Sequence, residues 1–258
     1  MNKPILWRPR SRTGAFAIAA LALTLAPPGL SLADPGPAQR PLLLELFTSQ
    51  GCSSCPPADA VLRELSTHKD LLPLAFHVDY WNNLGWVDPF SSASFTARQQ
   101  TYASIRGFEV YTPQLVVEGR SDVIGSSRSD VAATIASAGR DAKSVESSIQ
   151  RSGKDVDIAV GAVGDAASAA ADVYLLSFDS SDSTSIGGGE NSGRKLVYAN
   201  VVRSMRKVGE WRNQPLHLAE RLQAGESGDR LALLVQDSRG TVWAVASTGV
   251  TGASQPSP

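Results

Sequence analysis

The chain has 258 residues, with 24 Lys and Arg against 25 Asp and Glu, so its formal net charge at neutral pH is −1. This balance provides no extended basic field, and nucleic acid is therefore not an expected partner. The length is sufficient for one large domain or two small ones, and the chain contains only two cysteines.

Residues 1–33 have the pattern of a secretory signal peptide. Basic residues up to Arg12 precede an uncharged apolar stretch from Ala15 to Leu30, and small residues follow it. The stretch is interrupted by Pro27-Pro28-Gly29 and is too short to be expected to span a bilayer. Cleavage before Asp34 would leave 20 basic against 25 acidic residues, since four of the 24 basic residues are removed. The sequence therefore predicts a periplasmic or secreted protein with no membrane span after processing.

A buried strand is expected over Leu42–Thr48, because this run is almost continuously apolar. It leads into Cys52-Ser53-Ser54-Cys55, and a strand followed by Cys-x-x-Cys and a helix is typical of a redox-active dithiol. A disulfide across so short a loop stabilises by only about 1.9 kcal/mol on the chain-entropy estimate. The pattern therefore favours a redox role over a structural staple or a metal site, and export would allow the disulfide to persist.

A helix is expected after the cysteines, because apolar residues recur at helical spacing as far as about Thr67. Leu74–Val78 then predicts a second buried strand, which places the cysteines at the carboxyl end of a parallel strand pair, where sites are commonly built. His77 and Asp79 share one face of this strand. They are a candidate acid/base pair or metal-ligand pair, and a hydrogen-bonded core histidine is the alternative.

Aromatic residues follow the second strand. Trp81 and Trp86 are candidates for an apolar platform that docks a substrate beside the dithiol, and a small hydrophobic core under a loop is the alternative. A helix is expected over 89–106. A hairpin is expected from Gln114 to Ile124, and a last helix after Ser129.

Beyond residue 145 the pattern becomes strand-like, with short alternating segments separated by turn residues. It predicts a small antiparallel β-sandwich-like domain at 145–250, packed on the first domain at 40–142, and a disordered tail at 251–258. The glycine-rich segment before Arg194 lacks the spacing of a phosphate-binding loop. Its simplest interpretation is a turn, but Glu190, Asn191 and Arg203 are candidates for a polar network between the two domains.

The order of elements in residues 40–142 resembles the thioredoxin fold. In that family a cis proline opens the hairpin strand and faces the dithiol, and Pro113 is the matching position. Several segments also look like a family of exported bacterial thioredoxin-like proteins of unknown function: Phe47–Pro57, His77–Trp81, Leu84–Phe90 and Gly189–Asn191. This resemblance implies an α/β fold and covers nearly the whole mature chain, but it supplies no established substrate.

These features predict a thiol-disulfide oxidoreductase. Cys52 is the expected nucleophile, exposed at a helix start whose free N–H groups would lower the thiol pKa from about 8.5 toward roughly 3.5 to 7.5. Cys55 is the expected resolving thiol, although Pro56-Pro57 would delay the helix start. Thr112, before a cis Pro113 beside Cys52, is expected to pair with the substrate backbone.

The expected partners are a protein or small-thiol disulfide substrate and a redox partner protein. No cofactor is expected other than the Cys52–Cys55 disulfide itself, and no nicotinamide or flavin site is visible in the sequence. The alternative function is a non-catalytic protein-binding module whose disulfide is structural. If the two domains are independent, residues 34–143 should fold as an isolated fragment.

Overall fold

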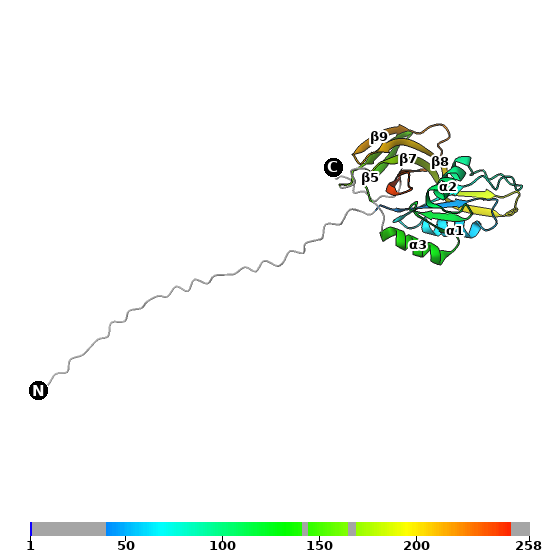
Figure 1. Cartoon of the computed structure of the whole chain (residues 1–258), viewed down its shortest axis with the longest axis horizontal. Helices are drawn as coiled ribbons and strands as arrows, with labels where there is room; N and C mark the ends of the chain where they lie inside the picture. Colours follow the sequence, from blue (N-terminus) through cyan, green and yellow to red (C-terminus); the bar gives the residue numbers. More distant parts are fainter. Residues whose placement is uncertain (2–39, 141–143, 165–168, 249–258) are drawn as a thin grey trace. The chain divides into compact units, whose positions relative to one another are not determined.

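Three helices and eleven strands make up the part of the chain that the structure describes (Figure 1). The structure is a computed structural model, and it describes residues 1, 40–140, 144–164 and 169–248. The helices are α1 (Pro56–Leu65), α2 (Ala93–Arg106) and α3 (Arg128–Arg140). The strands are β1 (Leu42–Thr48), β2 (Leu71–His77), β3 (Gln114–Val117), β4 (Ser121–Ile124), β5 (Ser147–Ser152), β6 (Asp155–Val160), β7 (Ala171–Ser185), β8 (Lys195–Trp211), β9 (Leu216–Arg221), β10 (Arg230–Gln236) and β11 (Val242–Ser247).

Eight strands form one mixed sheet in the order β11-β10-β7-β8-β2-β1-β3-β4, and β5, β6 and β9 form a second sheet that is antiparallel. The fold is therefore mixed α/β, with a large mixed sheet and a small antiparallel sheet. Within the described residues, no helix is long and apolar enough to cross a membrane. Beyond Met1, the predicted signal peptide lies outside the described residues, as does the predicted tail at 251–258.

The strand that leads to the cysteines, β1, coincides with the apolar run predicted at Leu42–Thr48. It pairs in parallel with β2, to which the chain crosses through α1, and antiparallel with β3. Every residue of β1 after Leu42 is buried, because neighbouring elements cover both faces of the strand. The cysteine loop therefore leaves the carboxyl end of a buried parallel strand pair.

The two halves of the chain meet where β8 runs beside β2. Their ladder contains one pair, Ala75 with Val201. Pro73 has no N–H group to extend it, and the carbonyl of Pro73 instead accepts a hydrogen bond from the Asn200 side chain at 2.7 Å. The described residues after Met1 form one compact unit. The domain boundary predicted near residue 145 does not separate two sheets, because β7, β8, β10 and β11 continue the sheet that contains β1.

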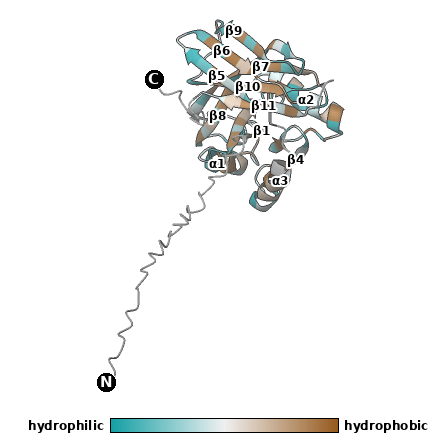
Figure 2. Ribbon diagram, turned by 90° about the vertical axis from the view of Figure 1, so that its left-hand side faces the viewer, coloured by the Kyte–Doolittle hydropathy of each residue, from teal (hydrophilic) through white to brown (hydrophobic). Residues whose placement is uncertain are grey.

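Helices and the small sheet bury both faces of the large sheet. Figure 2 shows apolar and polar residues alternating along strands, as expected when successive side chains point to opposite faces. One core lies between α2 and the sheet, and it joins Phe47 and Phe76 of the first half to Phe178 of the second. On other surfaces, α1 and α3 pack over β1 to β3, and the small sheet packs over β7 and β10.

A buried ion pair ties α2 to the sheet. Arg98 Nε and Nη2 donate to the two carboxylate oxygens of Glu45 in β1 at 2.6 and 3.0 Å. The Tyr102 hydroxyl also donates to Glu45, and Gln236 Nε2 in β10 donates to that hydroxyl at 2.9 Å. Removal of either charged partner would leave a buried unpaired charge, so this network holds β1, α2 and β10 in one arrangement.

Some elements differ from the sequence-based expectation. The helix expected over 89–106 begins at Ala93, because Ser92 caps it by accepting a hydrogen bond from the Ser94 N–H group. The sequence did not predict β5 and β9, because their exposed faces are polar and few of their residues are apolar. The second half also forms two long paired strands, β7 and β8, in place of the short ones expected.

Candidate active site at the Cys-Ser-Ser-Cys loop

The two cysteines form a disulfide, Cys52–Cys55, with a Cα–Cα distance of 5.4 Å. It lies between the end of β1 and the start of α1. Both cysteines have 0% of their surface exposed, whereas Ser53 and Ser54 are exposed. The expectation that Cys52 would be exposed and Cys55 alone shielded is therefore wrong for the oxidised protein. Segments from distant parts of the chain pack around the loop.

The loop is closed by two turns that bring the chain directly into α1. The Cys52 N–H donates to the Ser49 carbonyl and the Cys55 N–H donates to the Cys52 carbonyl, both at 3.2 Å. Cys55 is the N-cap residue and has helical dihedral angles, with φ −76° and ψ −39°. The helix begins at Pro56 without the delay expected from the proline pair. Proline fits the first turn of a helix because the N–H groups there need no partner within the helix.

Residues 187–194 lie in the connection between β7 and β8 and are called the cap below. The cap binds the backbone of the cysteine loop. Asn191 Nδ2 donates to the carbonyls of Gln50 at 3.0 Å and Cys52 at 2.9 Å. Glu190 Oε2 accepts a hydrogen bond from the Ser53 N–H at 3.0 Å. Two of the three residues proposed for a polar network between the halves therefore contact the dithiol loop itself.

Arg203, the third of those residues, lies elsewhere. Its guanidinium pairs with Asp179 at 2.6 Å and also with Asp182, and it stacks over the Phe90 ring at 4.3 Å. It makes these contacts because Asp179 and Asp182 lie on β7, the strand beside its own. Arg203 therefore stabilises the β7–β8 pair, and none of these contacts is with the cysteine loop.

The glycines of the cap allow it to lie directly on the loop that contains Trp86. A Cβ atom on Gly188 would come within 2.3 Å of the Gly85 carbonyl oxygen, and one on Gly187 within 3.1 Å of the Trp86 ring. Trp86 Nε1 donates to Gln50 Oε1 at 2.9 Å. Trp86 is therefore a partly buried support for the cap and the cysteine loop, in place of the open platform that its sequence position suggested.

Trp81 and Thr112 connect the segment before β3 to the cysteine loop. Trp81 Nε1 donates to Thr112 Oγ1 at 3.0 Å, and the Thr112–Pro113 peptide bond is cis, as predicted. A Cβ atom on Gly51 would come within 2.9 Å of the Trp81 Cβ atom, so only glycine fits before Cys52 without displacing Trp81. The residues predicted to bind substrate thus contact one another or the residues that lead into the cysteine loop.

A buried polar cluster lies at the carboxyl ends of β1 and β2, and the sequence pattern identified only its histidine. His77 Nδ1 lies 2.7 Å from Asp88 Oδ2, and the Gln50 N–H donates to the same oxygen at 2.8 Å. The predicted pairing of His77 with Asp79 does not occur. β2 ends at His77 and the chain turns, so that Asp79 accepts a hydrogen bond from Thr96 of α2 at 2.6 Å.

Asp59 and Tyr198 complete this cluster. Asp59 Oδ1 accepts a hydrogen bond from the Thr48 hydroxyl at 2.8 Å, and the His77 and Tyr198 rings have centroids 5.0 Å apart. Asp59 Oδ2, His77 Nε2 and the Tyr198 hydroxyl are buried without a hydrogen-bond partner among the described residues. The sequence pattern did not predict Asp59 or Asp88 as site residues. Asp59 gives no signal because it precedes an ordinary apolar helix face and its partners are distant in sequence.

The electrostatics of the two acids differ. Burial raises the pKa of Asp59 to about 6, and the opposing effects of His77 and the Thr48 hydroxyl are smaller. Burial also acts to raise the pKa of Asp88, but His77 and two backbone N–H groups outweigh it and the pKa is lowered. A cavity of about 270 Å³, lined by Asp59, Arg63 and Arg194 among others, lies beside the cluster. Asp59 is therefore an acid that can exchange a proton near neutral pH next to the dithiol.

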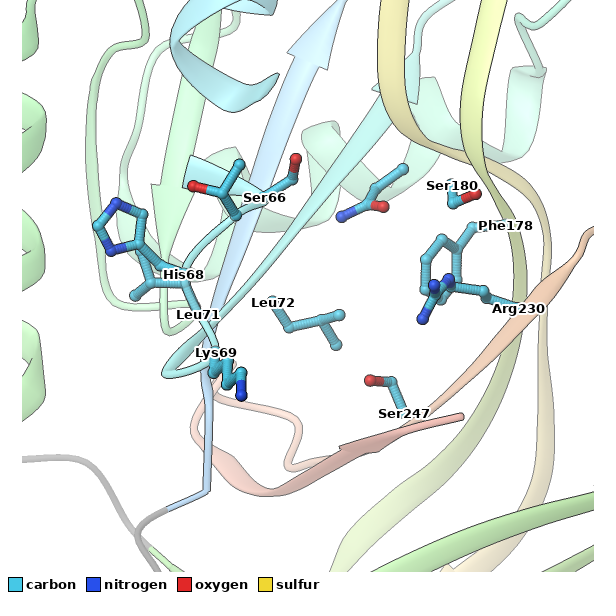
Figure 3. Close-up of a pocket in the computed structure, with 11 residues that line it drawn as sticks. Ser66, His68, Lys69, Leu71, Leu72, Phe178, Ser180, Arg230 and Ser247 are labelled. Atoms are coloured by element: carbon cyan, nitrogen blue, oxygen red, sulfur yellow. The ribbon is translucent and has the colours of Figure 1, made fainter. Parts of the chain in front are cut away.

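A second cavity, of about 300 Å³, lies where β2 and β8 diverge, near the start of β2 (Figure 3). Lys69 and Arg230 lie on opposite sides of it, with Leu72 between them. None of the candidate site residues lines it. The described residues contain no group of three or more His, Cys, Asp or Glu side chains arranged to hold a metal ion.

Comparison with known proteins gives a family and a fold. The crystal structure of protein AGR_C_4864 from Agrobacterium tumefaciens is 29% identical to this chain, covers 86% of it and 100% of its own length, and has a TM-score of 0.70. HBP35 of Porphyromonas gingivalis is only 10% identical, with a TM-score of 0.61 over 85% of this chain and 80% of its own, which is a likeness of fold alone. No curated protein matches the chain. The model of the DUF1223 family, described as a protein of unknown function, matches residues 43–236, and the chain therefore belongs to that family.

Proposed function

We propose that this protein is an exported thiol-disulfide oxidoreductase that uses Cys52 and Cys55 through a mixed-disulfide intermediate. The observation that carries the proposal is the disulfide itself, closed between the end of a buried parallel strand and the first turn of α1. A dithiol at a helix start can be oxidised and reduced without rearrangement of the strands and helices, because the disulfide joins residues of one short loop.

The arrangement of the first half supports a thioredoxin-like site. β1, α1 and β2 form a parallel unit, and the antiparallel β3 and β4 extend the sheet on the other side of β1. Pro113 directly precedes β3, the strand beside the one that ends at the cysteine loop. An extended substrate segment that approaches this surface would meet the backbone of Thr112, whose side chain is already fixed by Trp81.

In the proposed exchange Cys52 is the attacking thiol and Cys55 is the resolving thiol. In the reduced protein, the Cys52 thiolate attacks one sulfur of a substrate disulfide, forms a mixed disulfide and releases the other substrate sulfur as a thiolate, which takes up a proton. Cys55 then loses its proton and attacks Cys52, which forms the Cys52–Cys55 disulfide and releases the second substrate thiol. Asp59 lies one turn along α1 from Cys55 and is a suitable acceptor for that proton.

Access to Cys52 requires movement of the cap in this proposal. Exchange requires a sulfur atom of the substrate to approach the Cys52 sulfur directly. Neither cysteine has exposed surface while the cap lies on the loop. The bonds of Asn191 and Glu190 to the loop are the contacts that would be broken. The substrate is then a protein or small-thiol disulfide in the periplasm or outside the cell, and a second redox protein resets the pair.

The test is capture of the intermediate. Replacement Cys55→Ser should leave Cys52 joined to its substrates, so that tagged protein recovered from cells under acid-quenched, non-reducing conditions carries partners that dithiothreitol releases. Cys52→Ser is the matched control and should carry none. Recovery of no partner by Cys55→Ser, with the protein exported and folded, would refute the proposal.

A second function is favoured by two exposed apolar side chains near the cysteine loop's support, Trp86. Leu84 and Val87, which flank Gly85-Trp86 in the sequence, are 51% and 68% exposed, and exposed apolar side chains can bind an apolar segment of a partner. In this alternative the protein is a non-catalytic binding module and the disulfide only stiffens the loop. The capture experiment distinguishes the two functions. A binding module would hold its partners without a covalent bond, so the Cys52→Ser variant would recover them as well as the Cys55→Ser variant does.

A further inference from the structure

The start of α1 offers few backbone donors to a Cys52 thiolate. A helix start normally stabilises a nearby anion through its free N–H groups. Here the first two positions of α1 are Pro56 and Pro57, which have none. The next two N–H groups, those of Ala58 and Asp59, donate to the Cys55 carbonyl at 2.8 and 3.1 Å.

The first N–H after Cys52 is occupied by a carboxylate. Glu190 Oε2 accepts the Ser53 N–H at 3.0 Å. Hydrogen bonds with Ser53 lower the pKa of Glu190, so this side chain is negatively charged at neutral pH. A negative charge beside the loop opposes the formation of a second one on Cys52.

One uncharged group contacts the Cys52 sulfur among the described residues, a hydroxyl that can donate a hydrogen bond but brings no positive charge. Ser54 Oγ lies 3.3 Å from Cys52 Sγ. The cationic side chains of Arg63 in α1 and Arg194 in the cap are held by the neutral Val197 carbonyl and Asn191 Oδ1, and no described hydrogen bond joins either of them to the Cys52 sulfur. Burial of both cysteines adds to the cost of a charged sulfur.

These contacts bear on the direction of electron flow. A couple is strongly oxidising when its reduced form is stabilised, and a stabilised thiolate is how that is achieved. We propose that Cys52–Cys55 is instead a reducing couple, whose dithiol form gives two electrons to substrate disulfides. This inference rests on the proposed function and specifies its direction.

A complete catalytic cycle needs a second dithiol protein that reduces Cys52–Cys55 again. The protein dithiol and a substrate disulfide become the protein disulfide and a substrate dithiol, with two electrons and two protons transferred to the substrate. A reduced dithiol protein on the same side of the membrane must then return two electrons and two protons to Cys52–Cys55. The preceding reaction is therefore a thiol-disulfide exchange that supplies electrons to this protein, and the following one consumes a reduced substrate.

The equilibrium with thioredoxin, a strongly reducing reference couple, tests the direction. The full-length protein is mixed with equal amounts of reduced and oxidised thioredoxin and quenched with acid, and free thiols are counted by alkylation and mass spectrometry. A reducing couple stays partly oxidised in this mixture, so we expect at least about one molecule in the disulfide form for every ten in the dithiol form. A ratio further toward the dithiol would identify an oxidising couple and overturn the inference while leaving the exchange function intact. Failure to exchange from either starting state would overturn both.

Substitution of Glu190 tests the cause. Glu190→Gln keeps an acceptor for the Ser53 N–H and removes the charge, so the equilibrium should move toward the dithiol by roughly threefold to tenfold, and less at high salt because Glu190 is exposed. Pro57→Ala adds a backbone N–H at the start of α1 and should also move the equilibrium toward the dithiol. Glu210→Gln is the matched control, since Glu210 pairs with Lys207 at 2.9 Å on β8 and should cause no change. An unchanged or opposite equilibrium in Glu190→Gln would overturn the inference.

Discussion

Burial of Asp59 under the cysteine loop makes the stability of the fold depend on pH. The folded chain holds the proton up to a pKa of about 6, whereas the ordinary value is 3.8. A raised carboxyl pKa contributes stability that is fully present below pH 3.8 and lost as the pH rises through about 6. At about 1.4 kcal/mol for each pH unit, the free energy of unfolding falls by roughly 3 kcal/mol across this window.

Replacement Asp59→Asn should remove this dependence, because the amide keeps an acceptor for the Thr48 hydroxyl and carries no charge. Urea unfolding of the oxidised protein should show the variant gaining about 2 to 3 kcal/mol relative to wild type between pH 4 and pH 7.5. Asp155→Asn, at a carboxylate that is 69% exposed, is the control and should show no such change. An equal difference from wild type at both pH values would contradict the assignment of Asp59.

The sequence could identify the cysteines and the cis proline but not the cluster beneath them. Cys52, Cys55 and Pro113 stand out because residue type, spacing and the preceding apolar run occur together in a short stretch. Asp59 has no such local signal, because members of its cluster such as Tyr198 on β8 lie far along the chain. His77 was identified with the wrong partner, since the turn after β2 that brings in Asp88 has no signature in the pattern.

At the scale of elements, the cap is the part of the second half that bears on the chemistry. Its Asn191 makes two hydrogen bonds to the cysteine loop, and Gly188 lies against the Gly85 carbonyl. Loss of two hydrogen bonds of about 1 kcal/mol each should make opening of the cap more frequent by a factor on the order of ten or more. The cap was visible in the sequence only as a glycine-rich turn, because its contacts are with residues more than a hundred positions earlier.

Asn191→Ala and Gly188→Ala should both speed reduction of Cys52–Cys55 by dithiothreitol, by roughly tenfold for Asn191→Ala. The rate is measured by quenching with an alkylating agent and counting labelled cysteines. Asn213→Ala is the matched control, because Asn213 is a buried asparagine outside the cap that makes hydrogen bonds with both backbone groups of Val163. Reduction of Asn191→Ala at the wild-type rate would show that the cap does not limit access.

At the scale of the whole molecule, the two halves share a core as well as a sheet. Phe47 and Phe76 pack in one cluster with Phe178 and Leu234, and Arg98 of α2 donates to Gln236 of β10 at 3.1 Å. Local periodicity predicted most strands and helices of the first half correctly. It could not predict that β8 would pair beside β2, because the pairing of distant strands depends on contacts that no short stretch of sequence contains.

Residues 34–143 should therefore fail to fold as an isolated fragment, in contrast to what independent domains would allow. Its α2 face would expose the apolar residues that β7, β8 and β10 cover, and its buried Glu45–Arg98 pair would lose Gln236. We expect aggregation or a molten state with weak near-ultraviolet circular dichroism and a broad unfolding transition. A soluble fragment with sharp, cooperative unfolding would show that the first half is an independent domain.

The attack by Cys52 and release by Cys55 are tested most directly with the purified, fully reduced protein and a protein disulfide substrate. Acid quenching at successive times, followed by mass spectrometry, should show a mixed disulfide at Cys52 that rises and then decays as the Cys52–Cys55 disulfide forms. In Cys55→Ser the same species should accumulate and persist. Absence of any mixed disulfide at Cys52, or exchange no faster than with free glutathione at the same thiol concentration, would contradict a redox function for this site.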